Sequence, residues 1–77
     1  MSRPELSEAI QDYLKEIYKL QVENGRATTT RIARRMHVAP SSATAMLKKL
    51  SALGLAEHAR YRGVVLTDAG ERVALEV

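Results

Sequence analysis

The sequence contains no cysteine, no phenylalanine and no tryptophan. Without cysteine there are no disulfides, no thiolate metal sites and no cysteine nucleophile, which fits a reducing cytoplasm. Because three tyrosines are the only aromatic residues, the chain lacks the stacking surface that is typical of proteins that bind single-stranded nucleic acid. No apolar run approaches the roughly 18 residues of a membrane span, and no apolar stretch follows the first basic residue as it does in a secretion signal. We therefore expect a cytoplasmic protein without a membrane partner.

Acidic residues are nearly absent from the middle of the chain. The whole sequence has 77 residues and a net charge of +3, so it forms one domain at most, with a thin core. Residues 26–62 contain eight arginines and lysines and one acid, Glu57, which gives +7; the remaining residues contain four basic and eight acidic side chains, which gives −4. This layout predicts one face that attracts a polyanion and another that is turned away from it.

Apolar residues at three- and four-residue steps predict a first helix. The expected buried stripe is Ile10, Tyr13, Leu14, Ile17, Tyr18 and Leu20. Two starts are open: Ser2 with Glu5 has the form of a capping box, and Ser7 could cap a shorter helix. The helix should end at residues 24–25, because Gly25 accepts the left-handed terminal conformation at little cost.

A tight turn at residues 37–39 separates two further expected helices. Thr28 can cap the first of them, and Pro40 suits the first position of the second. The second of these helices should run from residue 40 to 53 and stop at Gly54, with Leu55 folding back as its apolar end. The expected inner faces are Ile32, Ala33 and Met36, then Ala43, Met46, Leu47, Leu50 and Leu53; Arg31, Arg34 and Arg35 are expected outside.

The pattern then changes to two short extended segments. Residues 56–60 and 64–66 are the expected strands of a hairpin, and its turn at residues 61–63 contains the glycine that a tight turn needs. Thr67 can cap a last helix from residue 68 to 77, where Asp68 complements the helix dipole. Because this helix shows no stop signal, we expect that the chain is the front part of a longer protein; a frayed natural terminus is the alternative.

This order of elements predicts a winged helix-turn-helix: a mainly α fold with a small β-hairpin, comprising three helices, a two-stranded wing and the start of a fourth helix, as one DNA-binding domain over residues 1–77. In this motif the second helix enters the DNA major groove, and its N-terminal residues reach the base edges. Serine and threonine hydroxyls can donate and accept hydrogen bonds there, and a small alanine can face a thymine methyl. The expected DNA-binding residues are Arg26, Thr28, Arg34, Pro40, Ser41, Ser42, Thr44, Ala45, Lys48, Arg60, Tyr61 and Arg62.

The expected tip of the wing is basic. Arg60 and Arg62 flank Tyr61 there, and an arginine in this place can lie along the DNA backbone or enter a narrow minor groove. A charged tip is also common in hairpins that bind nothing, so the tip supports the interpretation without deciding it.

Several stretches taken together resemble one known family. They are residues 9–18 (AIQDYLKEIY), 38–44 (VAPSSAT), 46–50 (MLKKL) and 61–70 (YRGVVLTDAG). This pattern resembles the N-terminal DNA-binding domain of the diphtheria-toxin-repressor family of iron- or manganese-dependent transcriptional regulators. The resemblance implies a homodimeric repressor on pseudopalindromic double-stranded DNA. It also implies a second domain after this one, with the dimer contacts and most of the metal ligands.

The resemblance places one metal ligand in this chain, at Asp12. A hard carboxylate suits manganese(II) or iron(II), which are the expected cofactors. The manganese branch of the family has a second carboxylate three residues later, where this sequence has Lys15; Glu16, four residues after Asp12, is the open alternative. His37 and His58 have no ligand spacing between them, and we interpret both as surface or structural residues.

The leading hypothesis is therefore a repressor-type transcriptional regulator, in which metal occupancy is coupled to operator binding through the first helix. A winged helix used for protein–protein contact is one alternative, because fold does not fix function, and a regulator that does not respond to metal is another. The +7 stretch disfavours the protein–protein alternative. We do not expect an enzyme, because the sequence shows no nucleophile–base pair, glycine-rich phosphate loop or metal-ligand cluster.

Overall fold

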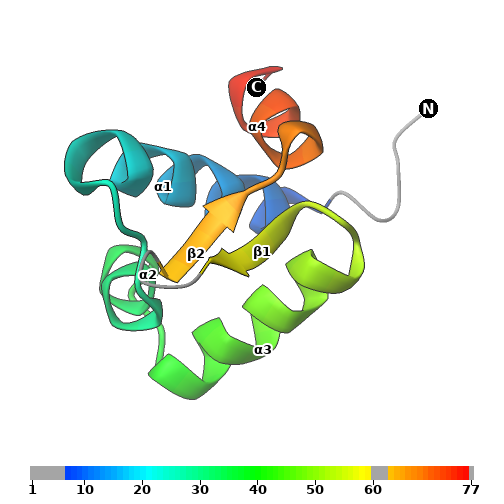
Figure 1. Cartoon of the computed structure of the whole chain (residues 1–77). Helices are drawn as coiled ribbons and strands as arrows, with labels where there is room; N and C mark the ends of the chain where they lie inside the picture. Colours follow the sequence, from blue (N-terminus) through cyan, green and yellow to red (C-terminus); the bar gives the residue numbers. More distant parts are fainter. Residues whose placement is uncertain (1–6, 60–62, 77) are drawn as a thin grey trace.

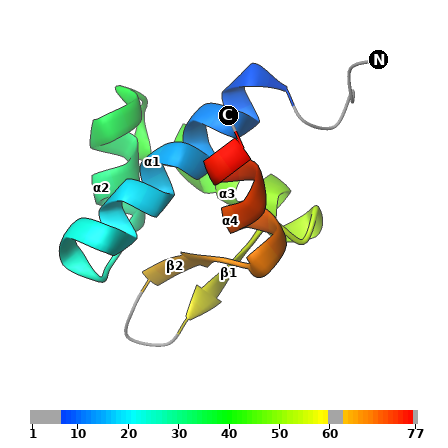
Figure 2. The same cartoon turned by 90° about the horizontal axis from the view of Figure 1, so that it is seen from above.

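A computed structural model describes residues 7–59 and 63–76. The elements follow in the order α1 (Glu8–Asn24), α2 (Thr29–Met36), α3 (Pro40–Ala52), β1 (Ala56–Ala59), β2 (Gly63–Leu66) and α4 (Asp68–Glu76). Helix α1 contacts α2, α4 and β2, while α3 packs against α2 and β1 (Figure 1). The hairpin projects to one side of the helices (Figure 2). The predicted winged helix-turn-helix order is confirmed.

Helix α1 begins at the later of the two predicted starts. The Ser7 hydroxyl accepts a hydrogen bond from the Ile10 amide over 3.3 Å, so Ser7 is the N-cap. The alternative start at Ser2 and Glu5 lies outside the described residues. Gly25 ends the helix at φ 71°, as predicted. The expected stripe is confirmed: Ile10, Tyr13, Leu14, Ile17 and Leu20 are buried, and Tyr18 is partly buried against the same core.

Helix α2 has a hydrogen-bonded cap at each end, and the second cap fixes the turn to α3. The Thr28 hydroxyl caps α2 by accepting from the Arg31 amide over 3.2 Å. At the other end His37 takes a left-handed conformation, φ 59°, while the Val38 amide donates to the Ala33 carbonyl over 3.0 Å. This is a Schellman-type ending. It lets Pro40 start α3 only a few residues later.

Helix α3 ends one residue earlier than predicted. The Leu55 amide donates to the Leu50 carbonyl over 2.9 Å, and the Gly54 amide donates to the Ser51 carbonyl over 3.0 Å, which is again a Schellman ending with Leu55 buried beneath it. The prediction that Leu53 is buried was wrong. Leu53 is 39% exposed and is the C-cap residue, which follows the last helical position.

The hairpin pairs Ala56 with Leu66 and Ala59 with Gly63 in antiparallel register. The sequence pattern predicted that Gly63 lies in the connecting turn. Gly63 is instead the first residue of β2. Its role is a close contact: it bridges to Ala27, and the Val64 amide donates to the Ala27 carbonyl over 2.9 Å. A Cβ on Gly63 would lie 2.8 Å from that carbonyl oxygen, at φ +78°.

The start of helix α4 is hydrogen-bonded to the turn that follows α3. Thr67 caps it, accepting from the Gly70 amide over 3.1 Å and donating to the Gly54 carbonyl over 2.7 Å. Gly70 lies directly on the Leu55 carbonyl, where any side chain would overlap it. Among the described residues, no helix is long and apolar enough to cross a bilayer.

Candidate nucleic-acid interface

The two faces of α3 differ sharply in burial. Ala43, Leu47 and Leu50 are buried against the core. Every α3 residue predicted to contact DNA is exposed: Pro40, Ser41, Ser42, Thr44, Ala45 and Lys48. The exposed face of α3 thus presents three hydroxyl groups near its start, the Ala45 methyl group and the Lys48 ammonium, while its other face packs against the core.

The start of α3 is also uncapped by any side chain. Ala39 occupies the N-cap position and makes no side-chain hydrogen bond. The first amide groups of a helix carry partial positive charge and need acceptors. Pro40 has no amide hydrogen, and the Ser42 amide donates to the Ala39 carbonyl over 3.0 Å, which leaves the Ser41 amide. An acceptor from outside the chain, such as a phosphate oxygen, can meet that need.

The other predicted DNA-binding residues have different environments. Arg26 and Arg34 are exposed, whereas the Thr28 hydroxyl is already engaged as the cap of α2. The predicted wing-tip residues Arg60, Tyr61 and Arg62 lie outside the described residues.

Sequence reasoning missed the side chain that holds the base of the wing. The Leu66 amide of β2 donates to the Gln21 side-chain oxygen over 2.6 Å. Together with the bond from Val64 to Ala27, this interaction ties the hairpin to α1 and to the loop that carries Arg26. A polar residue beside a buried stripe is common, so nothing in the sequence marked Gln21.

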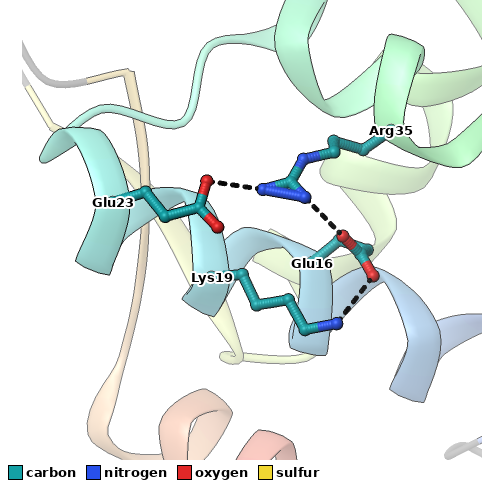
Figure 3. A network of polar contacts seen from close by, with 4 residues as sticks. All are labelled: Glu16, Lys19, Glu23 and Arg35. Atoms are coloured by element: carbon teal, nitrogen blue, oxygen red, sulfur yellow. Dashed lines mark hydrogen bonds and ion pairs between the residues drawn. The ribbon is translucent and has the colours of Figure 1, made fainter.

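The sequence pattern predicted that Arg35 lies on the outside of α2 together with Arg31 and Arg34. This prediction was wrong for Arg35, which is paired with two acids of α1. Its guanidinium Nη2 is 2.7 Å from Glu23 Oε1, and its Nη1 is 3.5 Å from Glu16 Oε1, so it joins α2 to α1 (Figure 3). The Arg35 side chain is 33% exposed. Its positive charge therefore faces two carboxylates of the same domain. A shallow hollow of about 450 Å³ lies beside it, lined by Leu20, Glu23, Arg31, Arg34 and Arg35.

The predicted metal ligand is accessible but isolated. The Asp12 carboxylate is exposed on α1, and no group of three or more His, Asp or Glu side chains gathers into a metal-binding cluster in the described ranges. Glu16, the alternative second carboxylate, is 3.4 Å from the Lys19 ammonium as well as being paired with Arg35. Asp12 fits the role of a single hard ligand, and a complete site needs further ligands from outside the described residues.

Helix order, hairpin and the exposed start of α3 together define a winged helix-turn-helix domain. Residues 5–64 match the family described as iron dependent repressor, N-terminal DNA binding domain. The chain belongs to this family, whose members are DNA-binding repressor domains and not enzymes. The family expected from the sequence pattern is therefore confirmed.

Individual relatives agree with this assignment. The HTH-type transcriptional regulator MntR of Shouchella clausii is 42% identical over 65 residues, which cover 84% of this chain and 46% of the relative. Among solved structures, ScaR with bound Zn²⁺ matches with a TM-score of 0.78 at 36% identity, over 87% of this chain and 31% of that one. The manganese regulator SloR matches with a TM-score of 0.75 at 32% identity, over 84% and 30%. The chain spans about half the length of the curated relatives it matches.

Proposed function

We propose that this chain is the DNA-reading domain of a metal-responsive transcriptional repressor that acts in the cytoplasm on double-stranded operator DNA. The observation that carries the proposal is the division of α3 into a buried face and an exposed, uncapped start rich in hydroxyls. A helix of this kind fits the major groove, where its first residues meet the base edges.

Each part of the exposed surface has a distinct proposed role. Ser41, Ser42 and Thr44 hydrogen-bond to base edges or to the phosphates beside them, and Ala45 faces an apolar edge such as a thymine methyl. Pro40 fixes the helix start at the groove. Arg26, Arg34 and Lys48 lie on phosphates. Thr28 does so as well by donating its hydroxyl hydrogen to a phosphate oxygen, while the same oxygen accepts from the Arg31 amide. At the wing tip Arg60, Tyr61 and Arg62 follow the backbone or enter the minor groove.

We further propose that Asp12 contributes one ligand to a divalent metal, manganese(II) or iron(II), whose other ligands lie outside this chain. Two relatives support a metal: the structure of ScaR contains Zn²⁺, and SloR is a manganese regulator. A bound divalent cation supplies a fixed positive charge that several carboxylates can share. Asp12 would tie the orientation of α1 to that charge.

Operator recognition in this proposal needs two copies of the domain. A single α3 reads only a few base pairs, and helix-turn-helix repressors place two such helices about one helical turn apart on a pseudopalindrome. We place the dimer contacts in a second domain that follows this one in the full-length protein.

The reading role of α3 is tested with Thr44→Glu. A carboxylate at this exposed position meets the negative potential of the groove, so we expect specific duplex binding to be lost while the circular dichroism spectrum and unfolding midpoint stay the same. Binding is measured on a duplex selected from a random library by the wild-type protein. Unchanged affinity for that duplex would reject the placement of α3 in the groove.

The metal role is tested with Asp12→Ala in the full-length protein. Asp12 is exposed and has no ion-pair partner among the described residues, so the domain should stay folded. We expect metal-stimulated operator binding to be lost, because occupancy and DNA affinity are coupled reciprocally. If the variant responds at wild-type metal concentrations, Asp12 is only a surface acid, while the DNA-reading role stands.

A further inference from the structure

Both ion pairs that join different helices in the described part of the chain end on one residue, Arg35. Its guanidinium lies between Glu23 and Glu16, which come from the same helix two turns apart (Figure 3). Lys19 lies between the two acids on α1 and pairs with Glu16 Oε2 over 3.4 Å. Arg35 is thus bound across two points along α1, which constrains the direction of α2 as well as its distance.

The position of α2 determines the position of the reading helix. Arg35 lies in the last turn of α2, only five residues before Pro40 begins α3, and the turn between them is closed by the Val38–Ala33 hydrogen bond. Helices α2 and α3 also pack against each other. A rotation of α2 about α1 would therefore be transmitted to the exposed start of α3 with little loss.

We propose that Arg35 is a positioning residue for DNA recognition. By bridging Glu16 and Glu23 it sets the angle between α1 and the helix-turn-helix, so that the base-specific contacts of α3 depend on two acids that touch no DNA. This inference rests on the proposed function, in which α3 reads the operator. It assigns a role in DNA specificity to Arg35, Glu16 and Glu23, which do not belong to the exposed surface of α3.

The direction of the change in DNA affinity distinguishes a positioning role of the two acids from a simple effect of their charge. Replacing Glu16 and Glu23 by glutamine removes two negative charges, so a purely electrostatic view predicts tighter binding to DNA. A positioning role predicts weaker binding to the specific duplex. Partly exposed ion pairs are weak, and the two together correspond to about a three- to tenfold change.

The experiment compares Glu16→Gln/Glu23→Gln with a matched control, Glu8→Gln/Glu76→Gln, which removes the same charge from exposed positions at the far ends of α1 and α4. Each pair of substitutions is made in the full-length protein and titrated with a duplex selected by the wild-type full-length protein from a random library, and with the unselected pool. We expect the first variant to lose about three- to tenfold on the selected duplex relative to the control, with no loss on the pool. Equal or tighter binding to the selected duplex would overturn the proposal.

Arg35→Met separates positioning from direct phosphate contact. If Arg35 touched a phosphate, the slope of log affinity against log salt would fall by about 0.9. The proposal predicts reduced affinity for the selected duplex with an unchanged slope. A smaller slope would assign Arg35 to the DNA surface and overturn its role as a positioning residue.

A measurement without DNA keeps the two proposals distinct. Residual dipolar couplings of backbone amides report the angle between α1 and α2, and we expect them to change in Glu16→Gln/Glu23→Gln but not in the control. If the wild-type full-length protein selects no duplex over the pool, the proposed function fails, yet the couplings still decide whether the acids orient α2. Unchanged couplings would refute the positioning role, and the single Glu16→Gln and Glu23→Gln variants serve where the double variant unfolds.

Discussion

The contact between Gly63 and Ala27 is the point at which the wing meets the helix-turn-helix, and Gly63→Ala tests it. The Ala27 carbonyl oxygen accepts a hydrogen bond from the Val64 amide over 2.9 Å. The same oxygen would lie 2.8 Å from a Cβ added at Gly63. Real Cβ contacts are longer, so the new methyl group must push the carbonyl away and stretch the hydrogen bond that holds β2.

The cost has two parts that a second glycine can separate. Alanine in the left-handed conformation costs about 1–2 kcal/mol relative to glycine, and both Gly63 (φ +78°) and Gly25 (φ +71°) have that conformation. Only Gly63 adds a clash, since a Cβ at Gly25 meets nothing within 4 Å. Overpacking typically costs about 1–3 kcal/mol. We therefore expect Gly63→Ala to lose about 1–3 kcal/mol more stability than Gly25→Ala.

The assay is urea unfolding followed by far-ultraviolet circular dichroism on both variants and the wild type. In a domain of this size 1 kcal/mol corresponds to about 4–8 °C in the unfolding temperature, so thermal scans provide an independent check. The unfolding slope with urea should stay constant, because the surface exposed is the same. An equal loss of unfolding free energy in the two variants would refute the reasoning, because the contact with the Ala27 carbonyl would then add no cost to a side chain at position 63.

Two further predictions concern the wing and the core. Replacing Arg60 and Arg62 by alanine should weaken binding to all duplexes and lower the slope of log affinity against log salt by about 0.9 for each phosphate that is no longer neutralised; an unchanged slope would mean that the wing does not touch DNA. Burial raises the pKa of Tyr13 above its ordinary value of 10.0, because desolvation disfavours the phenolate. The unfolded chain then loses this proton first, so stability falls as pH rises above 10.0. Tyr13→Phe should flatten that fall in urea titrations across the alkaline range, and an equally steep fall would assign it to other groups.

The local signals in the sequence were sufficient for the order and the ends of most elements. Caps act within three or four residues, so Ser7 and Thr28 could be recognised from the pattern alone, and the hydroxyl bonds are present in the structure. The same holds for the burial of α1, whose apolar residues from Ile10 to Leu20 recur at helical spacing over about three turns. These features depend on neighbours in the sequence, which is why they could be predicted without the fold.

Features that depend on distant neighbours could not be predicted in the same way. Glycine is typical of turns, so the sequence pattern placed Gly63 in the turn. Its position in β2 is explained by its contact with the backbone of Ala27, which is far away in the sequence. Arg35 has the same local environment in the sequence as Arg34. Its pairing with Glu16 and Glu23 follows from the angle at which α2 crosses α1, which periodicity does not give.

The two proposals meet on a single line along α1. Asp12, Glu16, Lys19 and Glu23 recur at steps of four, three and four residues, so their side chains follow one another along the same face of the helix. The proposed metal ligand is at one end of this line, followed by the two acids that hold Arg35, with Lys19 between them. A positive charge bound at Asp12 lies one helical turn from Glu16, which is already paired with Arg35. If that charge drew Glu16 away from Arg35, α1 would hold α2 less firmly and operator binding would weaken, which is the opposite of the proposed metal response. The proposed metal must therefore leave the Glu16–Arg35 pair in place, so a metal titration of operator binding should give stimulation in the wild type and none in Asp12→Ala.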